Sequence, residues 1–294
     1  MRTWFLQLTR HGYYWFPPRL LRIVWALATH ALSQRQVFAV LARSSLKRLP
    51  FIEPEFPFKY LSRDYLVRGL SVRQRASCFT HHYQRLHDSI PALLLSQVLH
   101  GELQLLEERD GQNQYCIAMG LARTEVREGE IFLHLKVNGE PVYVLQFTIV
   151  PGTIVGSTAR DVLLISRLQG MKGCYTQVHA ATKVFHEVAP PALLLAVLQG
   201  IAQALDIREL AGVCATSQFS YTPSCAATFT DAYDDFFTKI GAVRSDGLFY
   251  LSPIPVEDKP LQDIRNGHKA RTRKKRAFKL EIADRAHDTL LGRN

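Results

Sequence analysis

An α+β fold built on a mainly antiparallel sheet is the class that this sequence predicts. The Asp-Gly pair at 110–111 and the Asn-Gly pair at 138–139 each separate two runs of strand length, and both are typical of tight hairpin turns. After residue 170, helical patterns alternate with short apolar runs. We therefore expect an antiparallel sheet from Leu103 to Leu168 that later strands extend into a mixed sheet. Flanking helices, a helical N-terminal region and a long basic C-terminal helix complete this fold class.

The first half of the chain predicts helices followed by strands. Ser71 is a good N-cap for a helix that runs to about His87, and Pro91 opens a shorter helix through Leu99. The prolines between Leu49 and Phe58 predict an extended connector. The other expected elements are helices over 19–31 and 34–47 and strands over 103–108, 115–122, 131–137, 142–150 and 162–168.

The second half predicts helices that alternate with shorter strands. Thr230 caps a helix that ends near Ile240, and Pro260 opens a long basic helix towards Thr289. The other expected elements are helices over 175–187 and 190–205 and strands over 210–215 and 248–251. These elements divide the chain into a basic, aromatic-rich helical extension over 1–58, an α+β core over 59–256 and a basic C-terminal helix over 257–294.

Positive charge is concentrated at the two ends of the chain. The formal net charge is +10, residues 1–50 hold eight Lys or Arg and no acid, and residues 257–294 hold eleven bases and six acids. The segment between them is therefore mildly acidic. Because net charge bears on partners rather than on fold, we expect an anionic partner, which is a membrane surface, a phosphate-bearing ligand or nucleic acid. We also expect the basic ends to converge on one face, although solvated helix faces are an alternative explanation.

The densest basic run lies in the expected C-terminal helix. A solvated helix face is again the alternative, and Phe278 is the one aromatic residue nearby, which weakens the case for single-stranded nucleic acid. The candidate contacts to phosphates of nucleic acid or lipid are Lys269, Arg271, Arg273, Lys274, Lys275 and Arg276.

Cysteine usage and the apolar runs predict a cytoplasmic location, with peripheral attachment to the inner membrane as a further option. The five cysteines form no CxxC pair and their number is odd, so a reducing compartment fits better than a disulfide framework. The first apolar stretch is interrupted by Arg22 and lacks a cleavage site. No run reaches the roughly 18 apolar residues that a membrane helix needs. No Cys/His cluster has zinc-site spacing, so no metal site is expected.

A glycine-containing segment between a strand and a helix is the candidate ligand loop. Glycine lets backbone N–H groups approach a phosphate, and the N-terminus of the following helix favours anions. The spacing matches neither a Walker loop nor the dinucleotide fingerprint, and a plain strand-to-helix turn explains the glycines equally well. The candidate ligand-binding residues are Arg167, Gln169, Gly170, Lys172 and Gly173.

The chain resembles the VirK/YbjX family of enterobacterial and related proteins over roughly residues 50–290. The resemblance rests on four segments: Arg167–Gly173, Ala181–Lys183 with the Leu-rich helix after Pro191, Tyr233–Phe237 before Gly241, and His268–Arg276. The usual arginine before the helix-starting proline is replaced by Pro190. The resemblance implies a bacterial protein associated with virulence, surface-protein display, the envelope, and resistance to antimicrobial peptides or other stress, without an established biochemical activity.

The element order is also similar to the N-acyltransferase fold, which binds acyl-coenzyme A. This resemblance implies that the Arg167–Gly173 segment cradles the pyrophosphate of a coenzyme A thioester. The tyrosine that usually serves as general acid in that fold reads Phe237 here, and Tyr233 is the candidate substitute one helical turn away. Two hypotheses follow: a non-catalytic or regulatory factor acting at a membrane surface or on nucleic acid, or an acyltransferase with an acyl-coenzyme A donor.

Overall fold

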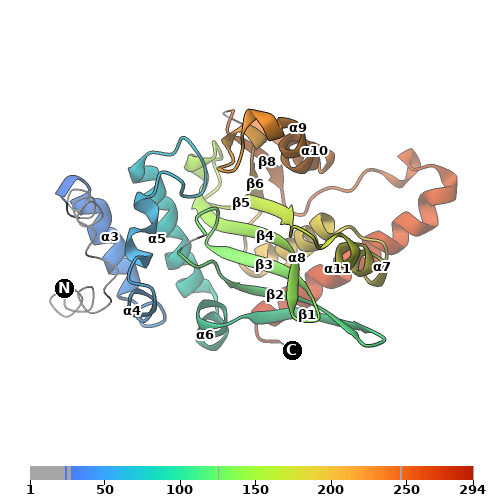
Figure 1. The fold of residues 1–294 in the computed structure, drawn as a ribbon, viewed down its shortest axis with the longest axis horizontal. Coiled ribbons are helices and arrows are strands. Elements are labelled where there is room, and N and C mark those ends of the chain that lie inside the picture. The colour runs from blue at the N-terminus through green and yellow to red at the C-terminus, as the bar shows by residue number, and fades with distance from the viewer. Residues whose placement is uncertain (1–23, 25–27, 125, 246, 294) are drawn as a thin grey trace.

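A mixed eight-stranded sheet forms the centre of the molecule, in the order β1-β2-β3-β4-β5-β6-β8-β7 (Figure 1). The computed structural model describes residue 24 and residues 28–124, 126–245 and 247–293. All neighbouring strands in this sheet pair antiparallel except β5 and β6, which are parallel. The predicted α+β class is therefore confirmed. The strands are β1 Leu103–Asp110, β2 Asn113–Leu121, β3 Ile131–Val137, β4 Glu140–Pro151, β5 Asp161–Gly170, β6 Glu209–Val213, β7 Val243–Ser245 and β8 Phe249–Pro253.

The two predicted hairpin turns are confirmed. Gly111 has a φ of 57° between β1 and β2, and Asn138 and Gly139 have φ of 53° and 84° between β3 and β4. Asn138 and Gly139 thus have the positive φ at both central residues that the predicted turn type requires, whereas in the first hairpin Asp110 still pairs with Asn113 and only Gly111 has a positive φ. Each tight turn makes the two strands that it joins neighbours in the sheet, so β1 lies beside β2 and β3 lies beside β4.

The helices lie around this sheet, which Figure 1 shows with α3, α4 and α5 to the left, α7 and α11 to the right, and α9 and α10 above. Helix α5 packs on β4, and α8 packs along α11. Ser71 caps α5 in a reciprocal capping box with Gln74, as its sequence predicts. The helices are α3 Ala31–Leu41, α4 Leu49–Ile52, α5 Val72–Ser89, α6 Ala92–His100, α7 Tyr175–Val184, α8 Pro190–Ala204, α9 Ala226–Phe229, α10 Asp235–Lys239 and α11 Lys269–Leu290.

Three expected elements differ in the structure. The expected connector over 49–58 is largely helical, because Pro50 and Pro57 sit in the first turns of α4 and of a 3₁₀ helix over Phe56–Leu61, where a missing N–H costs nothing. Thr230 is not an N-cap, because α9 begins before it and continues through a π-helical turn over Thr230–Asp234. The last helix begins at Lys269 rather than at Pro260.

Most of the helix predicted over 19–31 lies outside the described residues. The expected convergence of the basic ends is wrong for the described part of the N-terminal region. Helices α3 and α4 lie at the opposite side of the molecule from the first turns of α11 (Figure 1).

One hydrophobic core runs through the described chain, from Val37 in α3 to Leu290 in α11. The contact between α8 and α11 is especially close at Gly200, where an added Cβ would lie 2.0 Å from the carbonyl oxygen of Ala283. Within the described residues, no helix combines the length and the apolar character that crossing a bilayer requires.

Candidate functional site

A β-bulge in β5 determines which of its side chains point to each face of the sheet. Gln146 and Phe147 are consecutive in β4, yet they pair with Arg167 and Ile165, so Ser166 is an extra residue in β5. Because consecutive β4 residues point to opposite faces, Ile165 and Arg167 do so too. Arg167 therefore shares a face with Gln146 and with Phe132, the partner of Gln146 on β3. We call this face of β3, β4 and β5 the open face, because its side chains on β3 and β5 are half-buried, whereas those on β4 are buried.

The parallel strands β5 and β6 separate soon after they meet. They pair only from Leu163 and Leu210 to Ile165 and Gly212, whereas β5 continues to Gly170. The last part of β5 therefore has an edge that β6 does not pair. We call this part, residues 166–170, the free edge of β5.

Tyr233 reaches this free edge from the π-helical turn. The backbone N–H of Leu168 donates to the Tyr233 hydroxyl at 3.4 Å, and the tyrosine side chain is buried. Burial raises the pKa of Tyr233 to about 12, so its hydroxyl keeps its proton at neutral pH. π-Helical turns occur often at functional sites, and this one places the candidate acid beside the backbone of β5.

Phe237 has a packing role instead. A Cβ on Gly212 would lie 2.1 Å from its ring, so the glycine makes room for the phenylalanine. The ring is fully buried and stacks on Tyr250 with centroids 5.6 Å apart. Phe237 thus fills the core beside β6.

A polar groove of about 380 Å³ opens beside Arg167. The nearest charges are Arg167 Nη1 and Glu128 Oε2, 3.3 Å apart, on side chains that are 20% and 17% exposed. Burial raises the pKa of Glu128 and outweighs the opposite effect of Arg167. A second pair, Arg127 and Asp64, lies 3.9 Å apart. The groove is lined by Asp64, Val126, Arg127, Glu128, Arg167, Phe219 and Ser220.

Three buried polar atoms close to the bulge have no hydrogen-bond partner within the described chain. They are Gln146 Oε1, Ser166 Oγ and Arg167 Nε. Gln146 and Ser166 both close around Gly129, because a Cβ there would lie 2.8 Å from Gln146 Cβ and 3.2 Å from Ser166 Oγ. Since nearly all buried polar groups are normally paired, these three atoms leave unused hydrogen-bonding capacity close to the groove.

His134 adds a neutral imidazole to the open face. Burial lowers its pKa to about 4, opposed by Glu102, so the ring is uncharged at neutral pH. The ring stacks on Phe132 with centroids 3.9 Å apart. Because Arg167 also influences this pKa, the imidazole and the guanidinium belong to one electrostatic environment.

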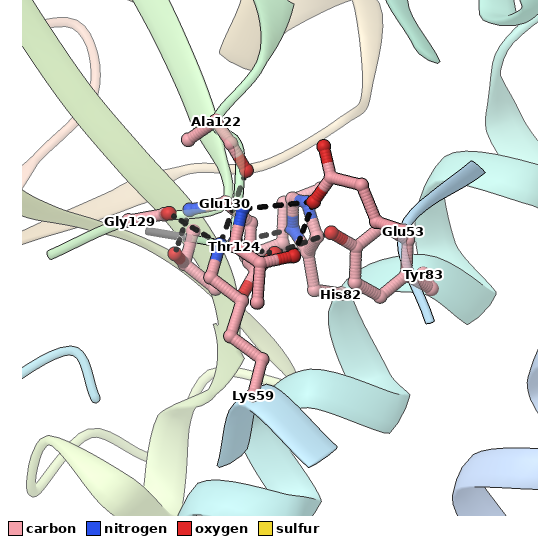
Figure 2. A network of polar contacts seen from close by, with 10 residues as sticks. Glu53, Lys59, His82, Tyr83, Ala122, Thr124, Gly129 and Glu130 are labelled. Atoms are coloured by element: carbon pink, nitrogen blue, oxygen red, sulfur yellow. Dashed lines mark hydrogen bonds and ion pairs between the residues drawn. The ribbon is translucent and has the colours of Figure 1, made fainter. Parts of the chain in front are cut away.

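A buried ion pair, shown in Figure 2, holds the segment that carries several groove residues. The Lys59 ammonium lies 3.2 Å from the Glu130 carboxylate, and neither side chain is exposed. The same ammonium donates to the carbonyl oxygens of Ala122, at 3.2 Å, and Gly129, at 3.3 Å. The Tyr83 hydroxyl also donates to Glu130. Lys59 therefore joins both ends of the segment between β2 and β3, residues 122–130, which carries groove residues.

Two further contacts hold this segment in place. The Glu53 carboxylate accepts the backbone N–H of Thr124 at 2.9 Å, as Figure 2 shows. The N–H of Leu66 donates to the carbonyl of Arg127 at 2.8 Å. The position of Glu128 is thus set by contacts that come from far apart in the sequence.

The five predicted ligand-binding residues do not form a single loop. Arg167 and Gln169 lie on the open face, and Gly170 is still in β5, paired with Tyr143. Lys172 and Gly173 are exposed ahead of α7, and Gly173 has a φ of 84° with no atom near its Cβ position. The predicted residues thus lie at two places: Arg167 is at the groove, and Gly173 is in a turn before α7. The free edge of β5 lies between them.

Sequence reasoning missed the groove residues Asp64, Arg127 and Glu128, and the two polar residues Gln146 and Ser166 at the bulge. Glu128 precedes β3 without a motif, and Gln146 and Ser166 sit inside apolar strands. A polar residue within an apolar run was the one available signal for the last two. Nothing in the local sequence indicates the bulge that brings them together.

The basic run of α11 is only partly neutralised. Arg271 lies 3.0 Å from Glu187, and Arg276 lies 3.4 Å from Asp258. Burial and the neighbouring Arg271 lower the pKa of Lys275. Of the remaining cations, Lys269 is half-buried, whereas Arg273 and Lys274 are exposed and have no acidic partner among the described residues.

Fold and groove together define a mixed-sheet α+β protein with a polar groove at a strand bulge. Within the described ranges, no three His, Cys, Asp or Glu side chains gather so that they hold a metal ion.

The chain belongs to the DUF535 family, described as proteins of unknown function, whose model matches residues 18–287. VirK/YbjX proteins belong to this family, so the resemblance is confirmed at that level. No curated protein matches the chain. No solved structure matches it either.

Proposed function

We propose that this protein binds a coenzyme A thioester along the free edge of β5 and transfers its acyl group to an amine in the groove. The observation that carries the proposal is the separation of β5 from β6, which leaves the strand edge between the groove and α7 without a partner strand in the described chain, with the N–H of Leu168 held by Tyr233. Unpaired strand backbone binds extended chains that carry amides, because they add to the sheet as another strand does. The pantetheine arm of coenzyme A is such a chain, with two amide groups.

The start of α7 offers a place for the phosphates of the same ligand. The first turn has no side-chain cap, so its backbone N–H groups are free to bind an anion. Gly173 keeps the approach open, and Lys172 adds an exposed positive charge. The basic composition of the chain favours the approach of such a ligand.

The groove and Tyr233 supply acid and base for the transfer. The amine nitrogen attacks the thioester carbonyl carbon, a C–N bond forms and the C–S bond breaks. Glu128, whose pKa burial raises, takes the proton from nitrogen. Tyr233 gives its proton to the departing sulfur and regains one from solvent. A ligand amide that accepts the N–H of Leu168 releases the tyrosine hydroxyl for this task.

The expected result is a ligand-dependent rise in melting temperature. Coenzyme A at a hundred times its dissociation constant stabilises a folded protein by about 2.7 kcal/mol. Lys172→Glu is expected to weaken binding by at least about fivefold, because it places a negative charge beside the phosphates. Lys183→Glu, an equal charge change at the other end of α7, is the matched control. If coenzyme A, acetyl-coenzyme A and long-chain acyl thioesters all leave the wild-type melting curve unmoved, the proposal fails.

A second candidate is a non-catalytic factor that acts at an anionic surface. The observation that favours it is the pair of exposed cations, Arg273 and Lys274, without acidic partners in the described part of the chain. A cytoplasmic protein at the inner membrane fits this candidate, as does a physiological role in virulence, the envelope or stress responses. The location is a proposal that follows from cysteine usage and the apolar runs, and the physiological role is a proposal that follows from the VirK/YbjX resemblance.

Reversing these two charges tests this candidate. Arg273→Glu/Lys274→Glu is expected to lower binding to anionic vesicles by at least about tenfold, since each basic residue near such a surface contributes about 1 kcal/mol. Arg123→Glu/Arg160→Glu changes two exposed arginines elsewhere and serves as the control. Vesicle co-sedimentation and DNA filter binding are compared at low and high salt. Equal losses in both double variants, or binding that salt does not weaken, would rule the candidate out.

A further inference from the structure

The groove carries positive and negative charges in equal number. Asp64 and Glu128 supply two carboxylates, and Arg127 and Arg167 supply two guanidinium groups. The two pairs are loose, at 3.9 Å and 3.3 Å. Each charged side chain in this groove therefore lies near an opposite charge, but at these distances the pair leaves each group able to bind a further charged ligand.

The inner pair is incompletely satisfied on both sides. The Arg167 guanidinium makes no hydrogen bond to the described chain beyond its contact with Glu128, and its Nε is buried without a partner. On the other side, burial raises the pKa of Glu128 in spite of Arg167. Each member of the pair would gain from a further opposite charge.

Ligands of a single charge fit this arrangement poorly. A simple anion on Arg167 meets the carboxylates of Glu128 and Asp64, and a simple amine on Glu128 meets Arg167 and Arg127. A like charge brought close costs free energy that the favourable contact has to offset. A ligand with both charges a few bonds apart satisfies both sides at once.

We propose that the groove binds a free α-amino acid with an apolar side chain, its carboxylate on the arginines and its amino group on Glu128. Val126 and Phe219 provide an apolar wall for the side chain, and a groove of about 380 Å³ holds a molecule of this size. The inference rests on the proposed function in one respect: the amino group beside Glu128 is the acyl acceptor. Binding of the amino acid itself does not depend on acyl transfer.

Calorimetric titration with leucine tests the proposal, carried out with and without coenzyme A. Leucine is expected to bind, and N-acetyl-leucine and leucine amide, which each lack one charge, are expected to bind at least about tenfold more weakly. Glu128→Gln is expected to lose affinity for leucine and to gain affinity for N-acetyl-leucine, because it removes the repulsion of the carboxylate. Arg167→Gln is expected to do the reverse, favouring leucine amide. Arg109→Gln, an exposed site at the β1–β2 hairpin, is the control that should change nothing.

The outcomes separate this inference from the acyltransferase proposal. Equal binding of leucine and its two analogues overturns the inference, as does the absence of leucine binding in both titrations. If coenzyme A binds while leucine does not, the acyl donor site stands and the inference falls. If leucine binds while no thioester does, the inference stands and acyl transfer falls.

Discussion

Replacing Lys59 with methionine is expected to destabilise the fold by about 3–5 kcal/mol, the range found when one partner of a buried ion pair is removed. The reason is that Glu130, which is fully buried, loses the cation that pairs with it in the described part of the chain, and the carbonyls of Ala122 and Gly129 lose a shared donor. Urea unfolding at neutral pH measures the effect. Lys183→Met, which removes an exposed lysine, should stay within about 0.5 kcal/mol of the wild type.

The double variant Lys59→Met/Glu130→Gln isolates the ion pair. It should be less destabilised than the two single variants together, because neither charge is then left unpaired. Additive losses would contradict the role given to this pair.

Gly200→Ala is the second change with a large expected effect, a loss of about 2–3 kcal/mol. An alanine Cβ would lie 2.0 Å from the carbonyl oxygen of Ala283, and backbone cannot move aside as a flexible side chain does. Helices α8 and α11 must separate instead, and their shared core contact is lost. Hydrogen exchange should therefore quicken over 269–290 more than over the central strands.

Gly267→Ala is the matched control for this helix contact. No atom lies within 4 Å of its Cβ position, and the residue precedes the same helix α11. It should leave stability unchanged or raise it slightly, because alanine restricts the unfolded chain. A Gly200→Ala protein as stable as the wild type would mean that the two helices have room to move apart.

Local sequence signals predicted the sheet well because they act within a few residues. The Asn138-Gly139 turn, the Ser71 cap and the five strands expected between 103 and 168 are all confirmed. The three elements that differ all involve proline or a helix start. There, Pro50 and Pro57 begin helical turns where an extended connector was expected, since the sequence pattern does not distinguish the two uses of proline.

The site was predicted only in part, because its geometry is not local. Arg167 was identified from a glycine-containing motif, yet the structure places it at the groove with Glu128 and apart from Gly173. Lys59 and Glu130 are separated by 71 positions in the chain, and their contact depends on how the residues just before β3 meet α5 and the 3₁₀ helix over Phe56–Leu61. The hydrophobic periodicity of a sequence indicates local helices and strands, and it does not indicate contacts between residues this far apart.

The number of residues in β5 matters because the bulge at Ser166 adds one residue that has no partner in β4. Residues 161–165 and 167–170 follow opposite phases of the strand alternation, and one extra residue sets that offset. Removing Ser166 would place Arg167 directly after Ile165, so the two side chains would still point to opposite faces and Arg167 would stay opposite Gln146 in a strand without a bulge. In a comparison of relatives, a one-residue gap at this point would therefore keep the charge of the groove, whereas a one-residue gap within 161–165 or 167–170 would exchange the faces for the residues on one side of the gap. The number of residues between Ile165 and Arg167 thus indicates whether the bulge is present.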